Sequence, residues 1–171
     1  MPIQCRRAFL LTGSYAQLAK RLYFSKVCQG STMKKYKIGY TSGVYDMFHI
    51  GHLNILRKAK EQCDFLIVGV TTDALCLQRK NKTPVICEAD RVAIVEAIRY
   101  VDRVILQENM DKLSVVKQYN IDVVFVGSDW KNTSSWNQYE KDFAQYGCKV
   151  EYLDHTDGIS STILRERLNA R

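Results

Sequence analysis

The chain has 171 residues, the usual size of one domain, and no stretch of it reaches the roughly 18–20 apolar residues that a membrane-spanning helix needs. Its formal net charge of +7 would suit a nucleic-acid-binding protein, but five of the 25 basic residues lie in residues 1–33, which contain no acidic residue. Residues 34–171 then hold 20 basic and 18 acidic residues, a net charge of +2, which argues against a nucleic-acid-binding surface on the body of the protein.

Residues 1–33 form a basic N-terminal extension with three open interpretations. Rich in basic residues and free of acidic ones, the extension resembles an organellar transit peptide. Met33 begins Met-Lys-Lys-Tyr-Lys-Ile, a natural start, so residues 1–32 are alternatively an extension that precedes the true initiation site. The third interpretation is a short amphipathic helix around Leu10–Phe24 that docks on the body or on a membrane surface. The sequence does not decide among the three.

Strands and helices alternate through the rest of the chain. The apolar runs that predict strands are Ile38–Thr41, Phe65–Val70, Val101–Leu106, Val123–Val126 and Val150–Leu153. The segments with helical periodicity are Leu53–Cys63, Asp90–Tyr100, Leu113–Lys117, Trp136–Tyr146 and Ser160–Leu168. This alternation predicts a Rossmann-like three-layer α/β/α fold with a five-stranded parallel sheet.

Polar loops follow four of the predicted strands. They are Gly43–His52, Thr71–Lys82, Gly127–Trp130 and His155–Thr162. Because ligands of open parallel sheets bind beyond the carboxyl ends of the strands, these loops are expected to converge on one site. Neither G-x-G-x-x-G nor G-x-x-x-x-G-K-[ST] occurs, so the chain carries neither the dinucleotide fingerprint nor a P-loop.

The segment His49-Ile50-Gly51-His52 stands where the first strand gives way to a helix. A helix amino terminus offers unpaired amide donors and the positive end of the macrodipole, so it attracts phosphate. Gly51 is expected to let backbone approach a ligand closely. Two other interpretations are a helix cap beside a core histidine, and a metal site completed by His155.

Four motifs in order resemble the nucleotidyltransferase superfamily, in its cytidylyltransferase branch, from about Met33 to the end of the chain. Gly-Val-Tyr-Asp-Met-Phe-His-Ile-Gly-His, which begins at Gly43, resembles the HxGH signature. Arg-Tyr-Val-Asp from Arg99 is similar to the R-Y-V-D motif, and Asp-Gly-Ile-Ser-Ser-Thr from Asp157 resembles R-T-E-G-I-S-T-[ST]. Gly-Ser-Asp-Trp-Lys from Gly127 is similar to the G-D-D-W of glycerol-3-phosphate cytidylyltransferases.

The resemblance implies attack by a substrate phosphate on the α-phosphorus of CTP, with pyrophosphate leaving. The attacking phosphate is an anion near neutral pH because its second pKa is about 6, so no side chain has to remove a proton. Catalysis then depends on alignment and on spreading the charge of the five-coordinate phosphorus. His49 and His52 are the predicted catalytic donors. The resemblance also implies Mg²⁺ bound with CTP and a homodimer.

The residues expected to bind CTP belong to the HxGH loop, the loop after the second strand and the last two loops of the chain. They are Val44, Tyr45, Asp46, Gly51, Lys82, Asp129, His155, Thr156, Gly158, Ile159, Ser160, Ser161 and Thr162. The serine-rich segment opens the last helix, where amides and hydroxyls form a phosphate-binding nest. Asp46 is expected to orient His49 or to approach Mg²⁺, with capping of a turn as the alternative. His155 departs from the family, in which arginine is usual, and histidine lacks the permanent bidentate fork of arginine.

The residues expected to bind the acceptor are Arg79, Lys112, Arg99 and Trp130. Each has an alternative interpretation without function. Arg79 lies in a basic turn that water would solvate, Arg99 has Asp102 or Glu96 within reach for an ion pair, and Trp130 is a residue type common in cores. The predicted enzyme transfers CMP to a phospho-alcohol, with sn-glycerol 3-phosphate as the preferred acceptor.

Other functions remain open at this point. Choline phosphate or ethanolamine phosphate would favour an aromatic cage, which Trp130, Trp136 and Tyr139 would supply. An adenylyltransferase and a non-catalytic nucleotide sensor or scaffold are further alternatives. The six cysteines have neither C-x-x-C nor zinc-like spacing, which predicts buried, reduced thiols and a cytoplasmic protein, or an organellar one if residues 1–33 are a transit peptide.

Overall fold

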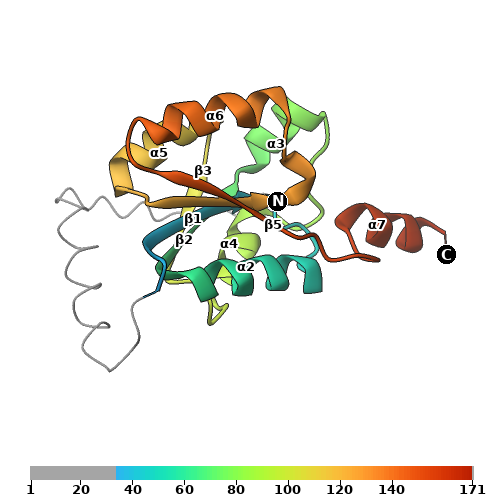
Figure 1. The fold of residues 1–171 in the computed structure, drawn as a ribbon. Coiled ribbons are helices and arrows are strands. Elements are labelled where there is room, and N and C mark those ends of the chain that lie inside the picture. The colour runs from blue at the N-terminus through green and yellow to red at the C-terminus, as the bar shows by residue number, and fades with distance from the viewer. Residues whose placement is uncertain (1–33, 171) are drawn as a thin grey trace, which may run out of the picture. The chain divides into compact units, whose positions relative to one another are not determined.

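The computed structural model describes residues 34–170, and the predictions made for residues 1–33 lie outside them. Five parallel strands form one sheet in the order β3-β2-β1-β4-β5 (Figure 1). The strands are β1 (Tyr36–Gly43), β2 (Cys63–Thr71), β3 (Arg103–Gln107), β4 (Val123–Gly127) and β5 (Lys149–Leu153). The helices are α2 (Ile50–Gln62), α3 (Asp73–Lys80), α4 (Glu88–Glu96), α5 (Lys112–Tyr119), the 3₁₀ helix η1 (Ser128–Trp130), α6 (Ser134–Ala144) and α7 (Ser161–Asn169).

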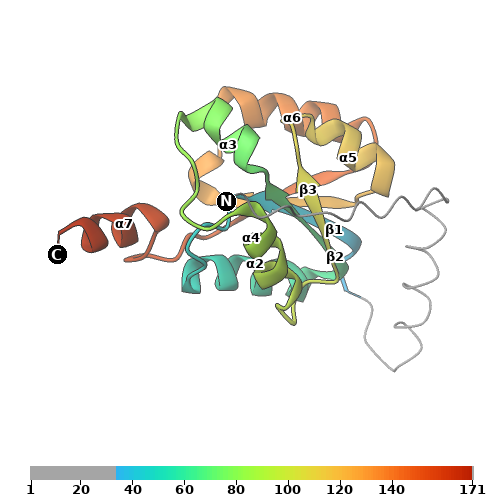
Figure 2. The same cartoon turned by 180° about the vertical axis from the view of Figure 1, so that it is seen from behind.

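Helices cover both faces of the sheet. Figure 1 shows α3, α5 and α6 on one side and α2 and α4 on the other, and Figure 2 shows the same layers from behind. The predicted Rossmann-like three-layer α/β/α fold with a five-stranded parallel sheet is therefore confirmed. Helix α7 extends away from the sheet in both views. No helix within residues 34–170 is long and apolar enough to cross a membrane.

The core lies beside the two central strands, β1 and β2. Leu66, Val68 and Val70 of β2 are buried, and α2 adds Leu56 and Ala59 from one face. Such nearly continuous burial along β2 is what a parallel sheet covered on both faces requires. Gly39 of β1 is needed for close packing, since a Cβ there would lie 2.6 Å from the ring of Phe125 and 2.7 Å from the sulfur of Cys63.

Two predicted elements differ from the structure in physically explicable ways. The segment predicted as a loop after β2 contains helix α3, which begins because the Thr72 hydroxyl accepts a hydrogen bond from the amide of Leu75. The predicted strand from Val101 begins two residues later, because Ile98–Val101 forms a turn in which the amide of Val101 donates to the carbonyl of Ile98 at 2.9 Å. Helix α4 accordingly ends at Glu96 rather than at Tyr100.

The register of the sheet brings the predicted loops to one edge. Gly43 pairs with Val70, and Gly127 pairs with Leu153, so these strands end together. The chain crosses from β1 to β2 on one side and reaches β4 on the other side of β1, which places the switch in strand order beside β1. The HxGH segment follows β1 directly and therefore stands at the position where open α/β sheets bind ligands.

We expect the substitution Gly39→Ala to lower the free energy of unfolding by about 1–3 kcal/mol, because the added methyl group overpacks Phe125 and Cys63. Urea unfolding followed by circular dichroism measures the change. Ala93→Ser, on an exposed position of α4, is the control. A loss for Gly39→Ala no larger than the loss for the control would contradict the packing described here.

Candidate active site

His49 caps helix α2 with its own side chain. Its backbone is extended (φ −137°, ψ 174°), and its Nδ1 accepts a hydrogen bond from the amide of Gly51 at 3.1 Å. Because an acceptor nitrogen carries no proton, the neutral imidazole of His49 holds its proton on Nε2. That N–H is the donor left for a ligand.

Gly51 allows the ring of His49 to fold back over the first turn of α2. A Cβ at this position would lie 2.9 Å from Cε1 and 3.0 Å from Nδ1 of His49. The same Cβ would lie 3.6 Å from Ile159, so α2 begins in contact with the loop that precedes α7. Gly51 therefore makes room for the capping side chain of His49, whereas the sequence predicted that it makes room for a ligand.

His52 stacks on His49 with ring centroids 3.9 Å apart and an interplanar angle of 24°. On its other sides His52 meets the rings of Tyr45 at 5.2 Å and Phe48 at 5.5 Å. Its Nδ1 is buried and has no hydrogen-bond partner within the described residues. The other ring nitrogen, Nε2, is therefore the atom of His52 left to contact a ligand.

Both imidazoles are neutral at physiological pH. Burial, with a smaller contribution from the neighbouring His49, lowers the pKa of His52 to about 4. Burial and the charge of His155 also lower the pKa of His49. The pair can therefore donate hydrogen bonds to phosphate oxygens without first binding a proton.

The loop after β5 is fastened to α2 by two side chains. Asn54 donates to the hydroxyl of Thr156 at 3.1 Å, and Lys58 donates to the carbonyl of Asp154 at 3.0 Å. His155 lies between these two points, is exposed, and has Nδ1 3.0 Å from the carbonyl oxygen of Thr156. The structure thus brings the loop after β5 to α2, with His155 close enough for its charge to act on both imidazoles.

The start of α7 reaches the HxGH loop through serine side chains. Ser160 caps the helix, since its hydroxyl accepts from the amide of Ile163 at 3.1 Å. Ser161 donates to the backbone carbonyl of Asp46 at 2.8 Å. Gly158, with φ +77°, adopts the left-handed backbone that lets the loop turn into the helix.

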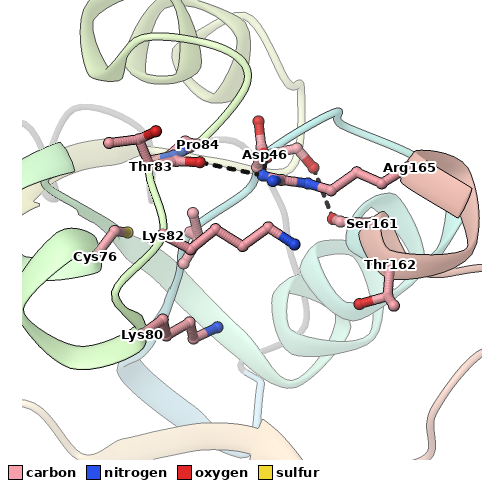
Figure 3. Close-up of a pocket in the computed structure, with 10 residues that line it drawn as sticks. Asp46, Cys76, Lys80, Lys82, Thr83, Pro84, Ser161, Thr162 and Arg165 are labelled. Carbon is pink, nitrogen blue, oxygen red and sulfur yellow. Dashed lines mark hydrogen bonds and ion pairs between the residues drawn. The ribbon is translucent and has the colours of Figure 1, made fainter. Parts of the chain in front are cut away.

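A pocket of about 230 Å³, called the phosphate pocket below, lies between α3, the following loop and the start of α7 (Figure 3). It is lined by Val44, Asp46, Cys76, Lys80, Lys82, Thr83, Pro84, Ser161, Thr162 and Arg165. Five of these residues were predicted to bind CTP: Val44, Asp46, Lys82, Ser161 and Thr162. Lys80 and Arg165 carry the additional positive charge of this pocket and were not singled out by sequence motifs.

Asp46 has a structural role that differs from the predicted one. Its carboxylate is buried, accepts hydrogen bonds from the amides of Val85 and Ile86 at 3.0 Å each, and forms an ion pair with Arg165. Burial alone would raise the pKa of Asp46, but the two amides and Arg165 outweigh burial and hold it below the ordinary value. Both oxygens are thus engaged by the protein, and Asp46 makes no hydrogen bond to His49 among the described residues.

Arg91 is fully buried and fixes the ends of β1 and β2. Its guanidinium donates to the carbonyls of Thr71 at 2.8 Å and Ile86 at 2.9 Å, and also to that of Val44. It pairs with Asp73 at 2.6 Å, at the first residue of α3. The buried guanidinium of Arg91 therefore positions the loops that follow β1 and β2. It also positions the segment before α4, which forms the far wall of the phosphate pocket.

A second pocket, of about 340 Å³ and called the acceptor pocket below, opens between α3, α5 and α6. Arg79, Lys112 and Trp130, three of the four residues predicted to bind the acceptor, line it together with Trp136 and Tyr139. Three further lining residues, Val44, Cys76 and Lys80, are shared with the phosphate pocket. The two pockets are therefore neighbours.

The amine of Lys112 is held in the acceptor pocket by a hydrogen bond and lies near an aromatic ring. Its amine donates to the hydroxyl of Ser42 at 2.8 Å and lies 6.0 Å from the ring centroid of Trp136. Burial, and secondly the charge of Arg79, lower the pKa of Lys112 to about 8. A bound phosphate would supply the counter-charge that this amine lacks in the pocket.

The predicted residues that line neither pocket are Tyr45, His49, Gly51, His52, Arg99, Asp129, His155, Thr156, Gly158, Ile159 and Ser160. Arg99 is exposed, donates to the hydroxyl of Tyr100 at 2.7 Å and lies just before the start of β3, at the opposite edge of the sheet. Asp129 is exposed and folds toward Gly127, where an added Cβ would meet its carboxylate at 2.3 Å. Tyr45 is buried against His52 and serves as packing.

The histidines do not form a metal site. Within residues 34–170 there is no group of three or more histidine, cysteine, aspartate or glutamate side chains placed to hold a metal ion. The thiols of Cys63, Cys76 and Cys148 are free and buried, as predicted, while that of Cys87 is free and exposed.

Comparison with known proteins agrees with this geometry. A family model described as cytidylyltransferase-like matches residues 40–167. The chain belongs to the cytidylyltransferase-like family. It is 38% identical over 129 residues to the glycerol-3-phosphate cytidylyltransferase of Bacillus subtilis strain 168, an alignment that covers 75% of this chain and 94% of the relative. The enzyme of the same name from Staphylococcus aureus is also 38% identical over 129 residues, with 75% of this chain and 92% of that protein covered.

More distant members of the family differ in length. The bifunctional protein HldE of Caulobacter vibrioides is 32% identical over 155 residues, which cover 90% of this chain but 32% of that protein. A crystal structure of the lipopolysaccharide core biosynthesis protein from Thermoplasma volcanium superposes with a TM-score of 0.59 at 26% identity, covering 70% of this chain and 96% of that one. The similarity therefore extends to a solved structure with this fold.

The lowered pKa of Lys112 predicts how acceptor binding depends on pH. The amine is charged below pH 8 and neutral above it, so the KM for a phosphorylated acceptor is expected to rise by about tenfold between pH 7 and pH 9. Steady-state kinetics at saturating CTP measure this KM. The KM for CTP over the same pH range is the control. If the KM for the acceptor rises no more than the KM for CTP, Lys112 does not bind the acceptor phosphate.

Proposed function

We propose that this protein transfers CMP from CTP to sn-glycerol 3-phosphate, giving CDP-glycerol and pyrophosphate. The observation that carries the proposal is the pair of adjoining cationic pockets lined by residues of the loop after β1, the loop that also leads into two stacked, neutral imidazoles. The names of the relatives from Bacillus subtilis and Staphylococcus aureus support glycerol 3-phosphate as the acceptor and CTP as the donor.

The chemistry proposed for the site needs no protein base. A phosphate oxygen of the acceptor attacks the α-phosphorus, a new P–O bond forms, and the bond to the bridging oxygen breaks, so that pyrophosphate leaves with the electron pair. His49 and His52 donate from Nε2 to oxygens of the five-coordinate phosphorus, where negative charge develops. Their stacking fixes the two donors relative to each other before the substrate arrives.

The acceptor pocket favours a neutral alcohol over a cationic head group. Arg79 and Lys112 line it, and none of its described lining residues is acidic. Trp136, which would form part of an aromatic cage, already has the amine of Lys112 near its face. A choline or ethanolamine group would therefore meet like charge in this pocket, whereas the hydroxyls of glycerol would not.

Magnesium fits as a companion of CTP rather than as a resident cofactor. Both oxygens of Asp46 are engaged, so the phosphate pocket supplies no available carboxylate. We propose that Mg²⁺ is held by the phosphate oxygens of CTP and by water, as is common where the ion accompanies a nucleotide. We also propose a homodimer, on the strength of the resemblance, and an influence of His155 on CTP affinity.

A substrate matrix tests the proposal. Pyrophosphate release is measured with CTP, ATP, UTP and GTP against glycerol 3-phosphate, choline phosphate and ethanolamine phosphate. We expect turnover with CTP and glycerol 3-phosphate, and little with the cationic acceptors. Turnover with ATP and not with CTP would establish an adenylyltransferase instead. Binding of nucleotide without turnover in any combination would establish a sensor or scaffold.

Two single substitutions test the role proposed for the histidines. His49→Ala and His52→Ala are each expected to lower kcat by about 10²–10³, the usual cost of removing one donor to a developing oxyanion. Asn54→Ala, which loosens the neighbouring loop without removing an imidazole, is the comparison variant and is expected to lose less. Full activity in either histidine variant would show that the proposed mechanism is wrong.

A further inference from the structure

The side chain of Gln107 lines the acceptor pocket, although no motif includes it and the proposed mechanism gives it no role. We infer that Gln107 is a specificity-determining residue, whose amide nitrogen donates a hydrogen bond to a hydroxyl group of the phospho-alcohol acceptor. The inference rests on the proposed function, because it names the residue that recognises the alcohol part of that acceptor. Arg79 and Lys112 of the same pocket are left for the phosphate.

Gln107 is fixed to the end of β2 by its backbone and by its side chain. It is the last residue of β3, it pairs with Thr71 in the register of the sheet, and its carbonyl accepts from the amide of Thr72 at 3.1 Å. Its side-chain oxygen Oε1 accepts from the hydroxyl of Thr71 at 3.0 Å. Gln107 is therefore held at the carboxyl edge of the sheet, where ligands of open α/β sheets bind.

The hydrogen bond from Thr71 also decides which way the amide of Gln107 points. Since Oε1 faces the hydroxyl, the nitrogen Nε2 lies on the other side of the amide group, where its described contact is the sulfur of Met110 at 3.9 Å. A thioether is a weak acceptor, and Nε2 carries two N–H donors. Gln107 is only 8% exposed, and a buried donor without a good acceptor is unfavourable. An oxygen atom of a ligand in the pocket would satisfy this donor.

Other neutral polar groups of the acceptor pocket are used within the protein. The hydroxyl of Thr71 donates to Gln107, and that of Tyr139 donates to a backbone carbonyl at 2.9 Å. The hydroxyl of Ser42 accepts from the amine of Lys112 at 2.8 Å. The amide nitrogen of Gln107 differs from these groups, because its donors have no strong acceptor among the contacts described for it.

The charges of the pocket divide the recognition of a phospho-alcohol between two kinds of group. Arg79 and Lys112 are cations and suit the phosphate, whereas the amide of Gln107 is neutral and suits a hydroxyl. Gln107 and Lys112 also line a smaller cavity of about 170 Å³, so the two residues lie close to each other. An acceptor whose phosphate meets Lys112 can therefore extend its carbon chain along the wall that holds Gln107.

The competing explanation is that Gln107 only ties the end of β3 to β2 through Thr71. Isothermal titration of the full chain with sn-glycerol 3-phosphate and with propyl phosphate separates the two roles, because these compounds share a phosphate and a carbon chain and differ in their hydroxyls. We expect Gln107→Met to weaken the binding of glycerol 3-phosphate by about tenfold and that of propyl phosphate by less than about threefold, since only the former loses a hydrogen bond. A purely structural role predicts equal losses for the two compounds.

Further variants keep the test valid if Gln107→Met folds poorly. Thr71→Val removes the hydroxyl that orients the amide, so it should lower the preference for glycerol 3-phosphate over propyl phosphate by about threefold. Thr71→Ser keeps a hydroxyl at this position and should restore most of that preference. Gln138→Met makes the same change as Gln107→Met at an exposed position that lines neither pocket, and it should bind both compounds as wild type does.

Three results would overturn the inference. These are equal losses of affinity for the two compounds in Gln107→Met, an unchanged affinity for glycerol 3-phosphate in that variant, and a wild-type protein that binds propyl phosphate as tightly as glycerol 3-phosphate. The titrations require no turnover. A chain that prefers glycerol 3-phosphate through Gln107, yet transfers no nucleotide to any acceptor, would therefore support the assigned contact and contradict only the proposed function.

Discussion

The buried carboxylate of Asp46 connects three segments that are far apart in the chain. It holds the amides of Val85 and Ile86 and the guanidinium of Arg165, while its own backbone carbonyl accepts from Ser161. Removing one partner from a buried ion pair usually costs about 3–5 kcal/mol, because the other charge is left uncompensated. The loop after β1, the wall of the phosphate pocket and the start of α7 therefore keep their places together. No residue of α7 is fully buried among the described residues, so these contacts with Asp46 are important for holding the start of the helix.

Arg91 connects separate segments in a similar way, and its contacts include the end of β2. It joins the carbonyls of Val44 and Thr71, at the ends of β1 and β2, to the first residue of α3. Burying a guanidinium is unfavourable unless its donors are satisfied, and here they are satisfied by backbone carbonyls that a loop would otherwise leave without partners. Asp46 and Arg91 thus fix, from two sides, the loop that carries the stacked imidazoles. A site that works by alignment requires such rigidity, since small displacements of donors weaken transition-state stabilisation strongly.

The fold and the position of the site were predictable because both follow from local patterns. Apolar runs alternate with helical periodicity, and a parallel sheet collects the loops after its strands at one edge. Helix α3 was missed because it is only eight residues long and begins at Thr72, within a segment that reads as a polar loop. Arg91 and Arg165 were missed as parts of the site for another reason. Most of their partners are backbone carbonyls and carboxylates from distant segments, and nothing in the neighbouring sequence reveals such contacts. Arg99 was predicted to bind the acceptor but lies at the opposite edge of the sheet, because a motif does not show at which edge its residues lie.

The central claim is that the two stacked imidazoles hold the α-phosphate through their Nε2 atoms. A crystal structure of the protein with CTP or a non-hydrolysable analogue tests this claim most directly. The account predicts Nε2 of both His49 and His52 within hydrogen-bond distance of oxygens bound to the α-phosphorus, with the stacking of the rings preserved. A nucleotide bound elsewhere, or an α-phosphate beyond the reach of both rings, would contradict it.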